Sequence, residues 1–155
     1  FGEHNNPSAH GAWRTNAHPE GIGTTVFDVY GYRTSSETTY PRNYSAMVRL
    51  GVSDDPKELE RCELTADDQG ETALPDRVLN GTAWKAFSYG DAAMMRYQKG
   101  VSYRLLRDGK CFALEKTAIG SSYRDEPSPS DIPDETLEAE YAKLDAIVST
   151  FTFVQ

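Results

Sequence analysis

Apolar and polar residues alternate most regularly over residues 101–119, and this alternation predicts a β-hairpin. Asp108-Gly109 separates two runs of strand-forming residues, and such a pair supplies the positive φ angles of a two-residue type I′ turn. With these two residues as the loop, Arg107 lies opposite Lys110, and every residue before Arg107 is assigned its own partner. The turn alone therefore predicts the complete register of the hairpin.

This register sorts the side chains of the hairpin onto two faces, because successive side chains of a strand alternate. The apolar face, which we expect in the core, carries Val101, Tyr103, Leu105, Phe112 and Leu114. On the other face, Leu106 lies opposite Cys111, and Arg104 is a diagonal neighbour of Glu115. We expect Arg104 and Glu115 to form a surface ion pair, which would contribute little to stability.

Further strands are predicted on both sides of the hairpin. They cover residues 24–32, 44–52, 82–89 and 150–154. Residues 67–81 are polar and rich in turn-forming residues, which indicates a turn region. Two interpretations of residues 91–99 stay open, namely a short helix that Asp91 caps or an irregular crossing into the hairpin.

A short helix is predicted where a capping sequence precedes an apolar pair. Asp55 is suited to the N-cap, Pro56 to the first helical position, and Glu58 to the role of capping-box partner. Leu59 and Cys62 are three residues apart, so they share one face of this helix. We therefore expect Cys62 to point inward, toward the sheet.

A second, longer helix follows a loop over residues 120–133 that holds three prolines. Its apolar stripe is that of an amphipathic helix and consists of Leu137, Tyr141, Leu144 and Val148. Together the elements predict an α+β fold, an antiparallel β-sheet with a long C-terminal helix and one or two short helices packed on it. The 155 residues suit an irregular N-terminal arm over residues 1–23, pinned by Trp13, and a single α+β domain over residues 24–155.

The net charge of the chain and its distribution limit the kinds of molecule that the protein can bind. The net charge is −8, from 16 basic and 24 acidic residues, and no long basic stripe suits a nucleic acid. No apolar run is long enough to span a membrane. Residues 96–110 hold five bases and one acid, so the end of the hairpin is a basic spot on an acidic protein. This pattern indicates either plain solubility, or steering toward a basic partner or docking of an anion on the hairpin.

The number of cysteines indicates the cellular compartment in which the protein works. Cys62 and Cys111 are the two cysteines of the chain, and an even count without a Cys-x-x-Cys spacing favours one disulfide. A disulfide indicates an oxidising compartment, either periplasmic or extracellular for a secreted protein. Such a bond would close a loop of roughly 50 residues, worth about 4 kcal/mol in the chain-entropy model. The alternative is a pair of buried free thiols in a cytosolic protein.

Motifs for catalysis and for cofactors are missing from the sequence. It has neither a Gly-rich phosphate loop after a strand nor a Gly-x-Ser-x-Gly elbow, so we predict a protein that is not an enzyme and needs no cofactor. A hydrolase with acids near the hairpin is the less favoured alternative. The three histidines, His4, His10 and His18, lie in the arm at spacings that match no zinc pattern, so we predict no metal site.

Tyrosines interleaved with small hydroxyl residues are typical of recognition surfaces. A Ser/Thr-rich loop over residues 33–41 is bracketed by such tyrosines. With two arginines of the hairpin, the predicted partner-binding residues are Tyr30, Tyr32, Tyr40, Tyr44, Arg104 and Arg107. The other interpretation is that tyrosine and threonine are simply good strand residues.

The predicted function is a non-catalytic exported domain that binds a protein partner. An inhibitor or immunity-type protein against a cell-envelope enzyme fits the acidic balance, because many such enzymes are basic. The alternative function is a carrier of a small ligand, with a pocket between sheet and helix. That pocket would be lined by Trp84, Phe87 and Tyr141.

Several segments of the second half share a pattern with a known group of proteins. They are Asn80-Gly81, Asp91–Met94, Ser102–Arg104, Asp108–Phe112 and Leu144–Phe153. This pattern resembles small exported bacterial domains of unknown function in the Mog1/PsbP-like group, and it is strongest in the hairpin and the tail. The resemblance implies an antiparallel sheet with packed helices, a binding or assembly role, an exported location and a Cys62–Cys111 bond. It carries over no catalytic residue.

Overall fold

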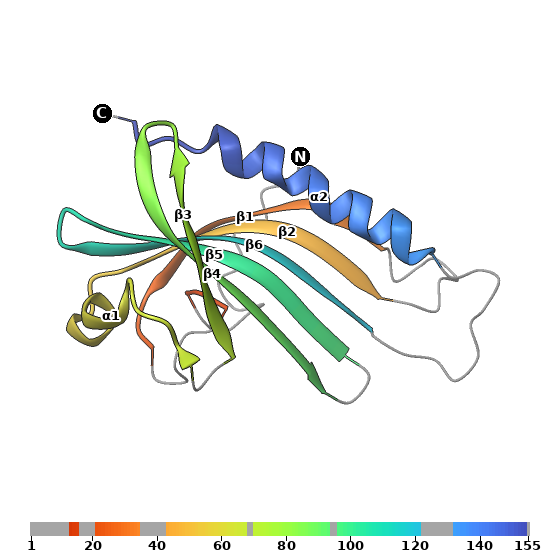
Figure 1. Cartoon of the computed structure of the whole chain (residues 1–155), viewed down its shortest axis with the longest axis horizontal. Coiled ribbons are helices and arrows are strands. Elements are labelled where there is room, and N and C mark those ends of the chain that lie inside the picture. Colours follow the sequence, from red (N-terminus) through yellow and green to blue (C-terminus); the bar gives the residue numbers. More distant parts are fainter. Residues whose placement is uncertain are drawn as a thin grey trace.

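The computed structural model describes residues 13–15, 21–34, 43–67, 70–93, 96–121 and 132–154. A long helix lies along one face of a six-stranded antiparallel sheet, and a short helix lies on the other side (Figure 1). The strands pair in the order β1-β2-β6-β5-β4-β3. Their bounds are β1 Thr24–Arg33, β2 Tyr44–Ser53, β3 Glu71–Leu79, β4 Thr82–Ala93, β5 Arg96–Arg107 and β6 Lys110–Ser121. The helices are α1 Pro56–Arg61 and α2 Asp134–Thr150. The broad expectation of an α+β fold is confirmed.

The hairpin formed by β5 and β6 has the register that the sequence predicted. Arg107 pairs with Lys110, and Leu106 pairs with Cys111. Both turn residues have positive φ, 51° at Asp108 and 71° at Gly109, as a type I′ turn requires. The predicted apolar face of the hairpin packs in the main core.

Three predicted elements were wrong, and in each case packing or pairing explains the difference. Residues 71–79 form β3 rather than turns, because an edge strand tolerates Pro75 and exposed polar residues. Asp91 is neither a helix cap nor part of an irregular crossing, since it pairs with Gln98 in the continuing β4–β5 ladder. The tail after α2 is not a strand; Phe151 and Phe153 instead pack their rings against Trp84.

Helix α2 covers one face of the sheet through the apolar stripe that the sequence predicted. Leu137, Leu144 and Val148 are buried, and Tyr141 is partly buried. Strand β1 passes close to the helix at Gly31, where an added Cβ would lie 2.5 Å from a methyl carbon of Leu144. Neither described helix is long and apolar enough to cross a membrane.

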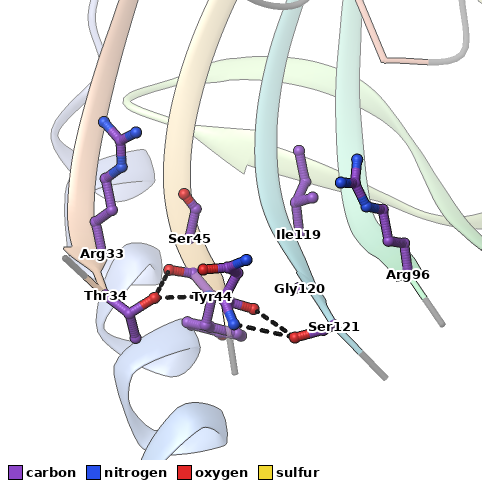
Figure 2. A pocket seen from close by; sticks show the side chains of 9 residues that line it. Arg33, Thr34, Tyr44, Ser45, Arg96, Ile119, Gly120 and Ser121 are labelled. Carbon is purple, nitrogen blue, oxygen red and sulfur yellow. Dashed lines mark hydrogen bonds between the residues drawn. The ribbon is translucent and has the colours of Figure 1, made fainter. Parts of the chain in front are cut away.

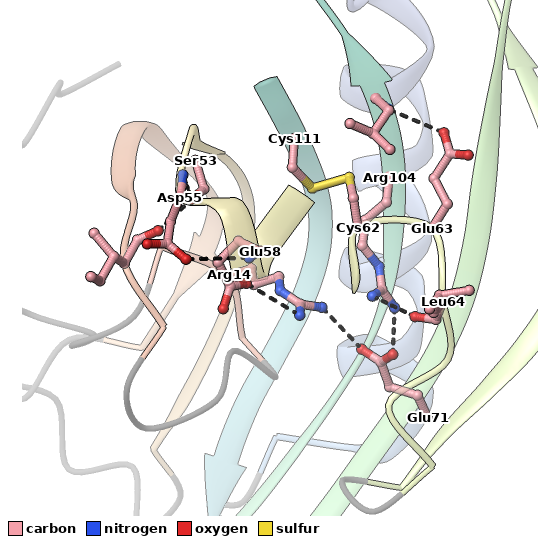
Figure 3. The surroundings of a disulfide bond; sticks show 12 residues. Arg14, Ser53, Asp55, Glu58, Cys62, Glu63, Leu64, Glu71, Arg104 and Cys111 are labelled. Carbon is pink, nitrogen blue, oxygen red and sulfur yellow. Dashed lines mark hydrogen bonds and ion pairs between the residues drawn. A yellow bond between two sulfur atoms is a disulfide. The ribbon is translucent and has the colours of Figure 1, made fainter. Parts of the chain in front are cut away.

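The opposite face of the sheet is covered in part by α1 and by the short segment 13–15 (Figure 3). Asp55 caps α1 by accepting hydrogen bonds from the backbone N–H groups of residues 57 and 58. The predicted disulfide joins Cys62 to Cys111 and ties α1 to β6. Trp13 is buried beside this bond, so it anchors the described part of the arm.

Buried charges fill the space between these covering segments and the sheet. Arg104 and Glu115 are 0% and 1% exposed, so the expectation of a surface ion pair between them was wrong. Arg104 pairs instead with Glu71, while Glu115 accepts a hydrogen bond of 2.6 Å from Arg49. The reason is that this face of the sheet is covered by segments distant in sequence, which a hairpin register cannot reveal.

Candidate functional site

A pocket of about 290 Å³ lies at the end of the sheet where β1 and β6 end and β2 and β5 begin. Most of its lining residues are polar, and Ile119 is its large aliphatic side chain (Figure 2). The lining residues are Arg33, Thr34, Asn43, Tyr44, Ser45, Arg96, Ile119, Gly120 and Ser121. Four strands therefore contribute to one site.

A β-bulge decides which way Arg33 points. Tyr30 pairs with Met47, but Tyr32 pairs with Ala46, so Gly31 is an extra residue in β1. Because an extra residue inverts the alternation of faces, Arg33 is brought opposite Ser45, on the face away from α2. Without the bulge the guanidinium group would point toward the helix, and the pocket would lose one of its two charges.

Strands β6 and β5 complete the row of side chains on this face. Ile119 pairs with Ser45 on one side and with Gln98 on the other. Arg96 lies at the start of β5, where it pairs with Ser121. Figure 2 shows Arg33, Ser45, Ile119 and Arg96 on the same side of the sheet, with the two arginines on the outermost of these four strands and Arg96 one row further along.

Both arginines are exposed, and neither has a carboxylate partner among the residues that the structure describes. Other arginines of the protein are held in ion pairs, and these are Arg14, Arg49, Arg77, Arg104 and Arg107. Arg33 is instead steadied by the ring of Tyr30, 5.5 Å from its Cζ atom. Within the described part of the chain, no carboxylate therefore neutralises the positive charge of the pocket, although the net charge of the whole chain is −8.

The hydroxyl groups of the pocket hold the strand ends together. Thr34 Oγ1 accepts a hydrogen bond of 2.9 Å from the backbone N–H of Tyr44, and Ser121 Oγ accepts one of 3.0 Å from that of Asn43. The phenol of Tyr44 donates to the carbonyl of Leu137 in α2, and burial raises its pKa, so it stays neutral. Since a guanidinium group does not give up its proton near neutral pH, this set of side chains is suited to binding an anion.

A smaller hollow of about 100 Å³ continues the depression along the same face. It shares Ile119 with the pocket and is otherwise lined by Thr15, Met47, Arg49 and Gln98. On the side of β4, Asp91 pairs with Gln98 and forms no ion pair with Arg96. The site therefore extends inward toward Arg49, and an acidic residue borders it on one flank.

Among the described residues, the tyrosines predicted to bind a partner do not lie on one surface. Tyr44 is only 3% exposed and contacts α2. Tyr30 lies on the face with Met47, whereas Tyr32 lies on the face with Tyr44, because the bulge separates them. Tyr40 lies outside the described residues.

The two arginines predicted to contact a partner have different positions. Arg104 is fully buried and stacks on the ring of Phe87, with its Cζ atom 3.7 Å from the ring centre, so it cannot contact a partner. Arg107 is exposed, but it pairs with Asp108 and lies 4.4 Å from the ring of Phe153. It sits at the opposite end of β5 from Arg96.

The pocket predicted between sheet and helix is not assembled from the residues named for it. Trp84 faces α2 and packs on Phe151 and Phe153, whereas Phe87 points to the other face of β4. Tyr141 contacts Lys116, whose Nζ atom is 4.2 Å from the ring centre. A three-residue separation in a strand without a bulge places Trp84 and Phe87 on opposite faces.

The predicted absence of a metal site is tested only in part of the chain. His4, His10 and His18 lie outside the described residues. Among the residues that are described, no group of three or more histidine, cysteine or carboxylate side chains could hold a metal ion.

Sequence reasoning missed Arg33 and Arg96. A glycine inside a strand pattern can mark a bulge, so Gly31 was the available signal for the orientation of Arg33. Arg96 could be placed only once β5 was known to begin there. Comparison with protein-family models, with curated proteins and with solved structures gives no match for this chain.

Proposed function

We propose that this protein is a non-catalytic binding domain that recognises an anionic group, a carboxylate or a phosphate, in the Arg33–Arg96 pocket. One observation carries the proposal: two exposed arginines without carboxylate partners in the described chain border a cavity of about 290 Å³. Arginine presents a planar fork of donors that matches both kinds of anion.

The acidic balance of the chain is compatible with such a ligand. At physiological salt, charges more than about 8 Å apart are largely screened, so the nearby arginines govern the pocket more than the distant acids do. The net charge of −8 lowers the rate of encounter with anions and thereby discourages nonspecific binding. The pocket would therefore select ligands by local geometry.

The disulfide supports placing this function in an oxidising compartment. Because the Cys62–Cys111 bond persists where thiols are not kept reduced, we extend the proposal to a periplasmic or secreted protein. The anionic group would belong to a protein partner in that compartment, and an inhibitor or immunity-type role fits this setting. The Mog1/PsbP-like resemblance is retained as part of the same proposal.

Thermal unfolding in the presence of inorganic phosphate tests the binding activity. A ligand that binds only the folded state raises the melting temperature, so phosphate should stabilise the protein beyond sodium chloride of equal ionic strength. Arg33→Gln and Arg96→Gln should each reduce that gain. The matched control is Arg107→Gln, which removes an exposed arginine at the other end of β5 and should leave the gain unchanged.

Two results would contradict the proposal. One is a phosphate effect no larger than that of chloride. The other is an effect that disappears in Arg107→Gln and persists in both pocket variants, which would assign anion docking to the hairpin.

A further inference from the structure

The two arginines of the pocket are separated by the width of two strands. Arg33 belongs to β1 and Arg96 to β5, and β2 and β6 lie between them. Neighbouring strands are about 4.8 Å apart, so the two Cα atoms are about 14 Å apart across the sheet. Arg96 also lies one row further along the strands than Arg33, since its partner is Ser121 and not Ile119.

A single compact anion can bind to either arginine but is too small to bridge both at once. Its oxygen atoms must lie about 3 Å from each donor nitrogen, and the whole of a phosphate or carboxylate group is only a few ångströms wide. Figure 2 shows the side chains of Arg33 and Arg96 standing up from the sheet, with Ser45 and Ile119 between them. The guanidinium groups therefore act as two separate points of positive charge.

The surface between these two points suits the middle of an extended chain. Ile119 offers apolar contact, and Ser45 offers a hydroxyl group without a hydrogen-bond partner in the described chain. An extended peptide advances about 3.3 Å per residue, so side chains four residues apart are about 13 Å apart. With the one-row offset, the two Cα atoms are about 16 Å apart, and the flexible arginine side chains can make up the difference of about 3 Å.

We infer that the ligand is an extended peptide segment of a partner, and that it carries two acidic side chains about four residues apart. One carboxylate pairs with Arg33, the other with Arg96, and the backbone between them crosses β2 and β6 over Ser45 and Ile119. This inference rests on the proposed function, and it adds the chemical class and the charge spacing of the ligand.

Capped peptides that differ only in their carboxylates test the inference. The reference is acetyl-Asp-Gly-Gly-Gly-Asp-amide, and two further peptides replace the first or the last aspartate by asparagine. Calorimetry with the full chain should show that either replacement weakens binding about two- to fivefold, the usual effect of losing one solvent-exposed ion pair. A peptide with adjacent aspartates, Gly-Asp-Asp-Gly-Gly with the same caps, should bind no better than a peptide with one carboxylate.

Variants of the protein assign each carboxylate to its arginine. The Arg33→Gln variant should bind one of the two asparagine peptides as tightly as it binds the reference peptide. The Arg96→Gln variant should do the same with the other asparagine peptide. Such coupling between a protein change and a ligand change is the signature of a direct pair. Arg107→Gln should bind all four peptides as the natural protein does.

These measurements distinguish a wrong charge spacing, a wrong class of ligand and a failure of the proposed function. If peptides with one carboxylate, two spaced carboxylates and two adjacent carboxylates bind equally, and binding still needs Arg33 and Arg96, the spacing is wrong and the anion pocket stands. If dodecanedioate or a linear polyphosphate binds at least tenfold more tightly than the reference peptide, the peptide class is wrong. If neither phosphate nor any peptide binds, the proposed function fails together with this inference.

Discussion

At the scale of single residues, the face of the sheet opposite α2 is held by charges that have almost no access to water. Glu115 is the centre of one such group, because its carboxylate accepts hydrogen bonds from the backbone and hydroxyl of Thr15 and from Arg49. Its partner Arg49 keeps a raised pKa: burial opposes the charge, but the attraction of Glu115 outweighs that cost. Each ion of this group is therefore tolerated only because its partner is present.

Glu115→Ala should lower the free energy of unfolding by about 3 to 5 kcal/mol, since it leaves the buried Arg49 without this carboxylate. Urea denaturation measures the loss. The control is Lys143→Ala, which removes an exposed ion pair within α2 and should cost at most about 0.5 kcal/mol. Equal losses in the two variants would show that burial of the Glu115 pair has no energetic importance.

Gly51 has a specific steric role. A Cβ atom added there would lie 1.8 Å from the carbonyl oxygen of Trp13, so Gly51→Ala should push segment 13–15 off the sheet. Trp13 would then become exposed while Trp84 stays in the core, and the tryptophan emission should shift to longer wavelength. Gly90→Ala is the matched control, because its nearest neighbour would be an ordinary 3.8 Å away. An unshifted spectrum in Gly51→Ala would contradict the docking of this segment.

At the scale of elements, helices and strands that are specified by neighbouring residues could be predicted from the sequence. Those that depend on residues far away in the chain could not. The Asp108-Gly109 turn fixes the β5–β6 register, and Asp55-Pro56 starts α1, because both rest on residues adjacent in the chain. Strand β3 was missed since it is polar on its exposed edge. The pocket was missed because it needs a bulge in β1 and the true start of β5.

The disulfide ties α1 to β6 and closes a loop whose ends are 49 residues apart in the chain. Replacing both cysteines by serine should therefore destabilise the protein by about 4 kcal/mol in the chain-entropy model, as measured by urea denaturation. The pocket lies at the other end of β6, so phosphate should still stabilise whatever fraction remains folded. A loss below about 1 kcal/mol would show that the bond adds little to the packing around it.

At the scale of the whole molecule, buried phenols make stability depend on alkaline pH. Burial raises the pKa of three tyrosines of the sheet and of one in α2, and these are Tyr44, Tyr89, Tyr103 and Tyr141. Because their folded pKa values lie above the unfolded value of about 10, the folded state holds more protons at high pH. The associated stability is complete below about pH 10 and falls as the pH rises further.

Absorbance at 295 nm during a rise in pH should therefore show a phase above about pH 10 that belongs to the buried phenols. These four tyrosines should ionise only together with the loss of circular dichroism from the sheet. Tyr89→Phe should reduce the amplitude of this phase, since Tyr89 is 6% exposed. Ionisation of all nine tyrosines in a single phase near pH 10 would contradict the burial of these four phenols.

Arginine side-chain NMR can show whether the protein binds anions between β1 and β5. The Nε–Hε resonances of Arg33, Arg96 and Arg107 can be assigned from their glutamine variants and followed while inorganic phosphate is added. We predict saturable shifts of the Arg33 and Arg96 resonances, with Arg107 unmoved. Unchanged pocket resonances, or equal shifts at all three arginines, would contradict anion binding in the pocket.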